Sequence, residues 1–210
     1  MTRAFAFLIV SLMLVADAGS ARAQSSNDDF FNFFGQRSSN YNRSAPNYGN
    51  QPYGAGSDYY GGGSSPIPRE LVNSPGQFAP GTIYISTAER RLYLILGNGA
   101  ALRYGIGVGR DGFGWSGTHR ITAKREWPGW TPPAEMRARR PDLPAYLPGG
   151  IENPLGARAM YLGSTLYRIH GSNEPETIGH AVSSGCIRMT NEDVTDLYNR
   201  VSVGTVVVVR

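Results

Sequence analysis

Cysteine and lysine are the scarcest reactive residues of this sequence, which has one of each, Cys186 and Lys124. A single cysteine cannot form an internal disulfide. The formal charge of +4 is a mild excess, and no cluster of basic residues is dense enough to predict a nucleic-acid partner. No segment is apolar over the roughly 20 residues that a transmembrane helix needs. Glycine (27) and proline (14) are abundant instead, which favours turn-rich β structure or unstructured segments over long helical bundles.

Residues 1–23 have the features of a secretory signal peptide. Arg3 gives a positive n-region, residues 4–16 give an apolar h-region, and Ala21-Arg22-Ala23 gives an A-x-A cleavage site. The alternative, an uncleaved membrane anchor, fits less well because the apolar run is shorter than a membrane span. We therefore expect an exported protein that is cleaved before Gln24 and keeps no transmembrane segment after cleavage.

Residues 24–78 are rich in Ser, Asn, Gly, Tyr, Gln and Pro and show no helical or strand periodicity. Because such a composition cannot bury a hydrophobic core, we predict a disordered linker that acts as a flexible tether. The composition then changes to runs of β-branched and aromatic residues, which predict one domain over residues 79–210.

This domain is predicted to be mostly β, with one late helix. Thr190 and Asp193 have the spacing of a helix capping box, and apolar residues follow at helical intervals. Asn98 and its flanking glycines are typical of a hairpin turn. Strand-like runs cover residues 82–86, 91–96, 101–108, 118–124, 158–169 and 205–209.

Two cofactor motifs can be considered. Residues 107–112 match the G-x-G-x-x-G spacing of dinucleotide-binding proteins, but no helix is predicted after them, so a glycine-rich β turn is the better interpretation. His170, His180 and Cys186 are all capable zinc ligands, but they lack the tight pair spacing of structural zinc sites. We predict no metal and no cofactor, and keep a zinc-dependent hydrolase as an alternative.

Cys186 is the candidate nucleophile. It follows Ser183, Ser184 and Gly185, small residues that allow a tight turn whose amides at Gly185 and Cys186 would face a developing oxyanion. A nucleophilic thiol needs a base, and His170, at the end of a predicted strand, is the candidate. The alternative is that Cys186 is a small buried hydrophobe, as most free cysteines are. An unpaired thiol in an exported protein favours the functional interpretation.

His170-Gly171-Ser172-Asn173 and the segment Ser183-Ser184-Gly185-Cys186-Ile187-Arg188-Met189 resemble the signature of the L,D-transpeptidase catalytic domain, also called the YkuD domain. Similar stretches at 114–117, 127–133, 153–156 and 193–198 extend the resemblance over residues 79–210. The resemblance implies a β-sandwich with a catalytic cleft. The sequence departs from it at Ser184, where many members have a histidine directly before the Gly-Cys pair.

The resemblance also implies roles for individual residues. Cys186 would attack the third residue of a peptidoglycan tetrapeptide stem and release D-alanine. His170 would carry the proton, with its imidazole oriented by the carbonyl of Gly171, and the amides of Gly185 and Cys186 would stabilise the tetrahedral intermediate.

Three further residues are expected to shape the same site. Ser183 and Ser184 would belong to the hydrogen-bond network of the substrate-binding turn. Arg188 would either hold a substrate carboxylate through a bidentate contact or form a salt bridge that supports the loop.

The partners implied are peptidoglycan stem peptides, and the expected compartment is the periplasm. The acyl acceptor would be an amine on a second stem peptide or on a protein to be anchored, such as an outer-membrane protein. Water as acceptor would give carboxypeptidase activity instead. A catalytically silent peptidoglycan-binding module is an alternative from a different functional class.

Overall fold

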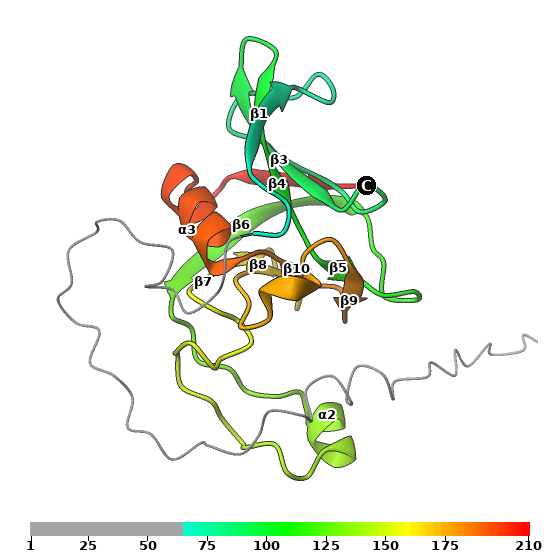
Figure 1. Ribbon diagram of the computed structural model, residues 1–210, viewed down its shortest axis with the longest axis vertical. Coiled ribbons are helices and arrows are strands. Elements are labelled where there is room, and N and C mark those ends of the chain that lie inside the picture. The colour runs from blue at the N-terminus through cyan, green and yellow to red at the C-terminus, as the bar shows by residue number, and fades with distance from the viewer. Residues whose placement is uncertain (1–64) are drawn as a thin grey trace, which may run out of the picture.

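The computed structural model describes residues 65–210, which are built mainly from strands (Figure 1). The predicted signal peptide and most of the predicted linker lie outside these residues. The helices are α2 (Ala134–Arg139), the 3-10 helix η2 (Pro175–Thr177) and α3 (Asn191–Arg200). The strands are β1 (Glu70–Asn73), β2 (Ile83–Ser86), β3 (Arg91–Gly97), β4 (Ala100–Gly105), β5 (Val108–Gly109), β6 (Gly117–Glu126), β7 (Arg158–Leu162), β8 (Arg168–His170), β9 (Ala181–Ser183), β10 (Ile187–Arg188) and β11 (Val206–Val209). Within residues 65–210, no helix is both long and apolar enough to cross a membrane.

The strand order shows how the sheet wraps around one core. Nine strands are hydrogen-bonded in the order β1-β4-β3-β2-β11-β6-β7-β8-β10, and β5 pairs with β9 separately. The long strand β6 belongs to both halves of the sheet, because its first residues pair with β11 and its last residues pair with β7. Its register shifts between Ile121 and Ala123, where the sheet changes direction.

A single large cluster of buried residues fills the space between the two halves of this sheet. It takes Ile83 and Leu92 from one half, Met160 and Ile169 from the other, and Leu197 from α3. Alternate residues of each strand supply these side chains, as expected for sheets that pack face to face. The prediction of a mostly β, sandwich-like fold with one main helix is therefore confirmed.

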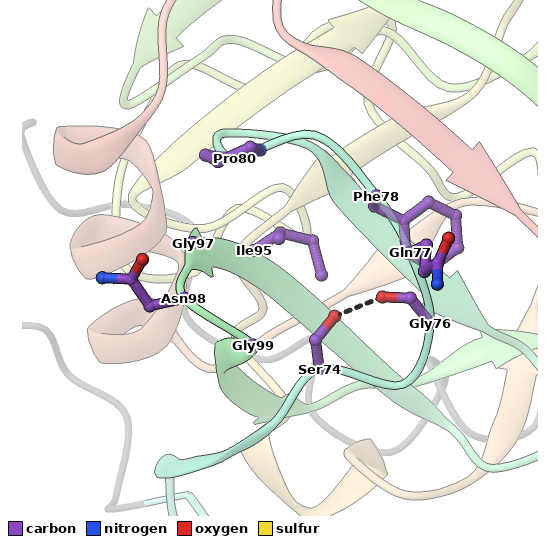
Figure 2. A pocket seen from close by; sticks show the side chains of 9 residues that line it. All are labelled: Ser74, Gly76, Gln77, Phe78, Pro80, Ile95, Gly97, Asn98 and Gly99. Atoms are coloured by element: carbon purple, nitrogen blue, oxygen red, sulfur yellow. Dashed lines mark hydrogen bonds between the residues drawn. The ribbon is translucent and has the colours of Figure 1, made fainter.

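The turn that joins β3 to β4 forms as the sequence predicts. Asn98 and Gly99 make a two-residue loop with φ angles of 51° and 75°, the left-handed conformation that such hairpins require. This end of the hairpin borders a surface pocket of about 460 Å³, which Figure 2 shows with Phe78, Pro80 and Ile95 in its lining. No predicted catalytic residue lines this pocket.

The prediction of one continuous strand over residues 158–169 is wrong. The segment forms β7 and β8, which pair antiparallel with Ala159 opposite His170. The chain reverses at Gly163, whose φ is 59°, and the hydroxyl of Thr165 closes the turn by donating to the carbonyl of Leu162 at 2.6 Å. A glycine inside an apolar run thus marks a hairpin rather than a strand interior.

The folded domain begins before residue 79, so the predicted linker boundary is too late. Residues 70–73 form β1, which pairs antiparallel with β4. Ile67 packs closely over Gly105 and Gly179. Arg69 reaches α3, where its guanidinium pairs with Asp193 at 3.2 Å and with Asp196 at 3.5 Å. These contacts join residues far apart in the sequence, so composition alone does not reveal them.

Helix α3 is capped at both ends by side chains. At its start, the Thr190 hydroxyl accepts a hydrogen bond from the amide of Asp193, which confirms the predicted cap. At its end, the ammonium of Lys124 donates to the carbonyls of Tyr198 and Val201, each at 2.6 Å. A cation at this end also opposes the negative pole of the helix dipole.

The long segment between β6 and β7 is tied at its base by a buried asparagine. The Asn153 side-chain amide lies within 3.3 Å of the carbonyls of Pro128, Leu147 and Pro148. Trp130 and Leu147 also exchange two main-chain hydrogen bonds of 2.8 Å. The segment, which includes the unpredicted α2, extends away from the sheet on the side opposite β1 (Figure 1).

Replacing Arg69 tests whether the segment before β1 stabilises the domain. Arg69→Ala leaves the carboxylate of Asp193, which is 4% exposed, without its cation. We expect a loss of about 1–3 kcal/mol in the free energy of unfolding, measured by urea denaturation. Arg103→Ala is the matched control, because its pair with Glu70 is solvent-exposed and should contribute at most about 1 kcal/mol. Equal losses in the two variants would contradict the role given to Arg69.

Candidate active site

The strands β8 and β10 lie side by side and bring the two halves of the catalytic signature together. They pair in parallel, with Ile169 opposite Ile187 and His170 opposite Arg188. The other edge of β10 is held as well, because Arg188 and Gly107 exchange two main-chain hydrogen bonds of 2.9 Å. The strand that follows Cys186 is therefore fixed on both sides.

Side-chain alternation places the polar members of this strand pair on one face. Ile169 and Ile187 belong to the hydrophobic core, so their neighbours along each strand point to the opposite face. His170 and Arg188 are paired positions and share that face. Cys186, two residues before Arg188, lies close enough to its guanidinium to interact electrostatically. Arg188 is thus the neighbour of both the predicted nucleophile and the predicted base.

The imidazole of His170 has a defined tautomer. Its Nδ1 lies 2.6 Å from the carbonyl oxygen of Gly171. A carbonyl oxygen can only accept, so Nδ1 carries the hydrogen and Nε2 keeps its lone pair. This is the contact that the sequence resemblance implied. Gly171 itself has no room for a side chain, because a Cβ there would collide with Oδ1 of Asn191.

His170 is neutral at physiological pH. Burial lowers its pKa to about 3, and the nearby positive charge of Arg188 acts in the same direction. The hydrogen bond to Gly171 opposes these effects, and Arg168 adds a further lowering. The protonated form of the imidazole is therefore disfavoured, and negative charge developing beside it would favour proton uptake.

Cys186 is the free cysteine of the chain and is partly exposed. Its Sγ lies 3.8 Å from the carbonyl oxygen of Leu166 in the hairpin between β7 and β8. Leu166 itself is 83% exposed. This placement contradicts the alternative that Cys186 is a buried core residue.

The turn before Cys186 is organised by the buried hydroxyl of Ser183. This hydroxyl donates to the carbonyl of Cys186 at 2.6 Å and accepts from the amide of Gly185 at 3.1 Å. The second bond corrects one expectation, because the Gly185 amide points to Ser183 and does not face an oxyanion. The Cys186 amide is therefore the remaining candidate donor to an oxyanion. Ser184 is exposed.

Two aromatic residues that sequence reasoning missed support this turn from behind. The Trp115 indole donates to the carbonyl of Gly185 at 2.7 Å. Its ring stacks on Tyr167 with a centroid separation of 4.4 Å and an interplanar angle of 3°. The conformation of Gly185, with φ of 105°, leaves space for the Tyr167 ring that a side chain would fill. The only signal in the sequence was the family-like stretch at 114–117, which does not reveal the contact.

Arg188 forms the salt bridge that was one of its two predicted roles. Its guanidinium lies 3.0 Å from Oε2 of Glu174, and its side chain is only 6% exposed. Burial lowers the pKa of Arg188, and the Glu174 carboxylate counteracts this effect. Recognition of a substrate carboxylate by Arg188 stays a prediction.

Neither cofactor motif is assembled into a site. Among residues 65–210, no three His, Cys, Asp or Glu side chains are grouped so that they could hold a metal ion, so His170, His180 and Cys186 do not form a ligand set. Gly112, with φ of 80°, lies in a turn closed by a hydrogen bond from Phe113 to Arg110. The glycines at 107–112 therefore serve a β turn and close backbone approaches, as the sequence predicts.

Comparison with known families agrees with this geometry. A family model described as the L,D-transpeptidase catalytic domain, YkuD, matches residues 80–209. The chain belongs to the L,D-transpeptidase family. The match covers the strand pair β8 and β10, the turn before Cys186 and helix α3.

Curated L,D-transpeptidases are similar over the same region. The chain is 40% identical over 148 residues to the probable L,D-transpeptidase YbiS of Escherichia coli, covering 66% of this chain and 47% of that protein. It is 38% identical to the probable L,D-transpeptidase ErfK/SrfK of the same organism, covering 66% of this chain and 46% of that protein. The chain therefore spans about half the length of these curated relatives.

A solved structure shares the fold of this L,D-transpeptidase domain. The Ldtfm-avibactam carbamoyl enzyme aligns with a TM-score of 0.51 at 20% identity, covering 63% of this chain and 49% of that one. At this identity the similarity establishes the fold, and the chemistry of the site is argued from the residues above.

Ser183 and Ser184 offer a matched pair of substitutions. Ser183→Ala removes the two hydrogen bonds that the Ser183 hydroxyl makes within the turn. We therefore expect Cys186 to be misplaced and turnover to fall by about tenfold or more. Ser184→Ala makes the same chemical change at an exposed position and should have a much smaller effect. Turnover of both variants, measured at equal protein concentration, checks the difference. A larger loss in the Ser184 variant would show that the exposed hydroxyl, and not the buried one, governs the site.

The pH dependence of stability tests the buried state of His170. Between pH 6.5 and about 3 the unfolded chain binds a proton on this imidazole that the folded protein does not bind. Stability therefore falls as pH drops through this window, by about 1.4 kcal/mol per pH unit from this group alone. His170→Gln should show a shallower loss in urea unfolding between pH 6.5 and 4. Parallel curves for the variant and the wild type would contradict the neutral, buried imidazole.

Proposed function

We propose that this protein is a peptidoglycan L,D-transpeptidase that uses Cys186 as nucleophile and His170 as proton carrier. The observation that carries the proposal is the hydrogen bond from Nδ1 of His170 to the Gly171 carbonyl, which leaves Nε2 as an acceptor, while Arg188, opposite His170, interacts electrostatically with Cys186. A carboxylate fulfils the orienting role in many catalytic triads. Here a main-chain carbonyl does so, and it adds no negative charge to the buried site.

The first step forms an acyl-enzyme. Nε2 of His170 takes the proton of the Cys186 thiol as Sγ attacks the carbonyl carbon of the third stem residue. The tetrahedral intermediate collapses when the bond to the terminal D-alanine breaks, and His170 gives its proton to the leaving amine. Burial keeps the imidazole neutral before substrate binds. His170 therefore takes the thiol proton only as the reaction proceeds.

The second step transfers the acyl group from sulfur to an amine. His170 removes a proton from the incoming amine, which attacks the thioester carbon and releases the thiolate as leaving group. The acceptor is an amine of a second stem peptide or of a protein to be anchored, with an outer-membrane protein as one candidate. Water in the same position gives L,D-carboxypeptidase activity as a side reaction.

The local surface suits a peptide donor. Leu166, whose carbonyl lies 3.8 Å from the thiol, carries an exposed apolar side chain, and Arg188, paired with Glu174, lies opposite His170. A stem peptide carries both apolar methyl groups and carboxylates. We place this reaction in the periplasm, on the features of the signal peptide in residues 1–23.

The alternatives make different predictions about the same residues. A catalytically silent peptidoglycan-binding module would not form a covalent adduct. A zinc-dependent hydrolase would depend on His180 as well as on His170 and Cys186. Adduct formation therefore separates the proposed mechanism from the binding module, and substitution of His180 separates it from the zinc-dependent hydrolase.

Mass spectrometry with a tetrapeptide-stem fragment tests the proposal. Wild-type protein should gain a covalent adduct equal to the fragment minus its terminal alanine and should release D-alanine. Cys186→Ala removes the nucleophile, so the adduct and the release should both be lost. His170→Ala removes the proton carrier and should lower the rate by about 100-fold or more.

His180→Ala is the matched control for the histidine substitution, because this side chain is exposed and we give it no catalytic role. It should retain wild-type activity. An active Cys186→Ala variant would refute the acyl-enzyme, and loss of activity in His180→Ala would favour a metal site. A folded, reduced wild-type sample that forms no adduct would favour the binding module.

A further inference from the structure

The indole of Trp115 holds the peptide bond between Gly185 and Cys186. Its Nε1–H donates to the carbonyl oxygen of Gly185 at 2.7 Å. In a trans peptide, the C=O and the following N–H lie in one plane and point in opposite directions. Residues 65–210 contain no cis peptide. The hydrogen bond to the Gly185 carbonyl therefore also fixes the direction of the Cys186 N–H.

The Ser183 hydroxyl acts on the neighbouring peptides of the turn. It accepts from the amide of Gly185, which belongs to the preceding peptide, and donates to the carbonyl of Cys186, which belongs to the following one. The peptide bond between them joins Gly185 to Cys186. Gly185 has a φ of 105°, and a glycine backbone has more freedom than that of any other residue. The contact with Trp115 is thus what defines its orientation.

Packing makes Trp115 a rigid support. Its ring stacks on Tyr167 with nearly parallel planes, and the edge of His119 lies against it at a centroid distance of 5.3 Å. Tyr167 in turn lies over Gly185, where a Cβ would come within 2.6 Å of the Tyr167 ring. Trp115, Tyr167 and Gly185 therefore pack together directly before Cys186.

We propose that Trp115 is a positioning residue for acyl transfer, which aims the Cys186 N–H at the oxyanion of the tetrahedral intermediate through the Gly185 carbonyl. As Sγ bonds to the carbonyl carbon, the π electron pair moves to oxygen, and the Cys186 N–H donates to this oxygen. When the leaving group departs, the pair returns to the carbonyl. A hydrogen bond to the carbonyl of the same peptide also polarises the N–H and strengthens it as a donor.

The proposal rests on the proposed function of Cys186, but its test uses two reactions of the same thiol that do not involve peptidoglycan. Acylation by 4-nitrophenyl acetate passes through a tetrahedral oxyanion. Alkylation by iodoacetamide displaces iodide directly and forms no oxyanion. A residue that aims the oxyanion donor should affect only the first reaction.

Trp115→Phe is the decisive variant, because phenylalanine retains an aromatic ring for stacking on Tyr167 and lacks the N–H donor. We expect its acylation rate to fall by about tenfold or more while its alkylation rate stays within about twofold of wild type. With the stem peptide, kcat should fall and KM should change little. Tyr93→Phe is the control, since it also removes one hydrogen-bond donor, to Glu89 at 2.6 Å, in a separate buried cluster.

Two other outcomes overturn the proposal. Unchanged acylation in Trp115→Phe would show that the Cys186 N–H needs no support from the indole. A parallel loss of acylation and alkylation would show that the substitution disturbs the whole turn, which is a structural role. Failure of the wild type to react with the stem peptide would instead refute the proposed function, and the comparison of ester and alkylating agent would still decide the role of Trp115.

Discussion

The parallel pairing of β8 with β10 is the interaction on which the site depends. The two strands are only three and two residues long, and they are separated along the chain by the segment that contains η2 and β9. Their register places His170 opposite Arg188 and directs both away from the core. A shift by one residue would turn the imidazole into the hydrophobic interior and the isoleucines outward. The core residues Ile169 and Ile187 therefore fix the register and, with it, the geometry of the site.

The same strand pair creates an electrostatic constraint. A buried imidazole lies opposite one arginine and two residues after another, and both guanidinium groups disfavour its protonated form. Glu174 balances the buried charge of Arg188. The orienting partner of His170 is a neutral carbonyl, and no carboxylate among residues 65–210 contributes to its pKa. Such a site is stable with a neutral imidazole and depends on its reaction partners for the negative charge that makes proton transfer favourable.

Local patterns in the sequence predicted the features that depend on neighbours along the chain. The hairpin at Asn98 and the cap at Thr190 follow from the conformational preferences of a few adjacent residues. The candidate pair His170 and Cys186 followed from chemistry and from resemblance to a family signature. The contact between Nδ1 and the Gly171 carbonyl was expected from the same resemblance.

The features that were missed depend on tertiary contacts. Arg69 reaches an aspartate 124 residues away, and Trp115 reaches a carbonyl 70 residues away, so neither contact leaves a periodic pattern in the sequence. The orientation of the Gly185 amide depends on which way a flexible turn folds around the Ser183 hydroxyl. Composition suggested disorder up to residue 78, because it cannot show that Ile67 fits over two glycines of the domain.

The placement of Lys124 has a consequence for the proposed transfer of an acyl group to an amine. Its ammonium is the only lysine amine of the chain, and two helix carbonyls and the ring of Tyr198 surround it. An arginine guanidinium, the other basic group of this protein, is a poor nucleophile because it stays protonated. In the proposed mechanism, the folded domain would therefore offer the Cys186 thioester almost no side-chain amine, and the acyl group would be left for an external acceptor.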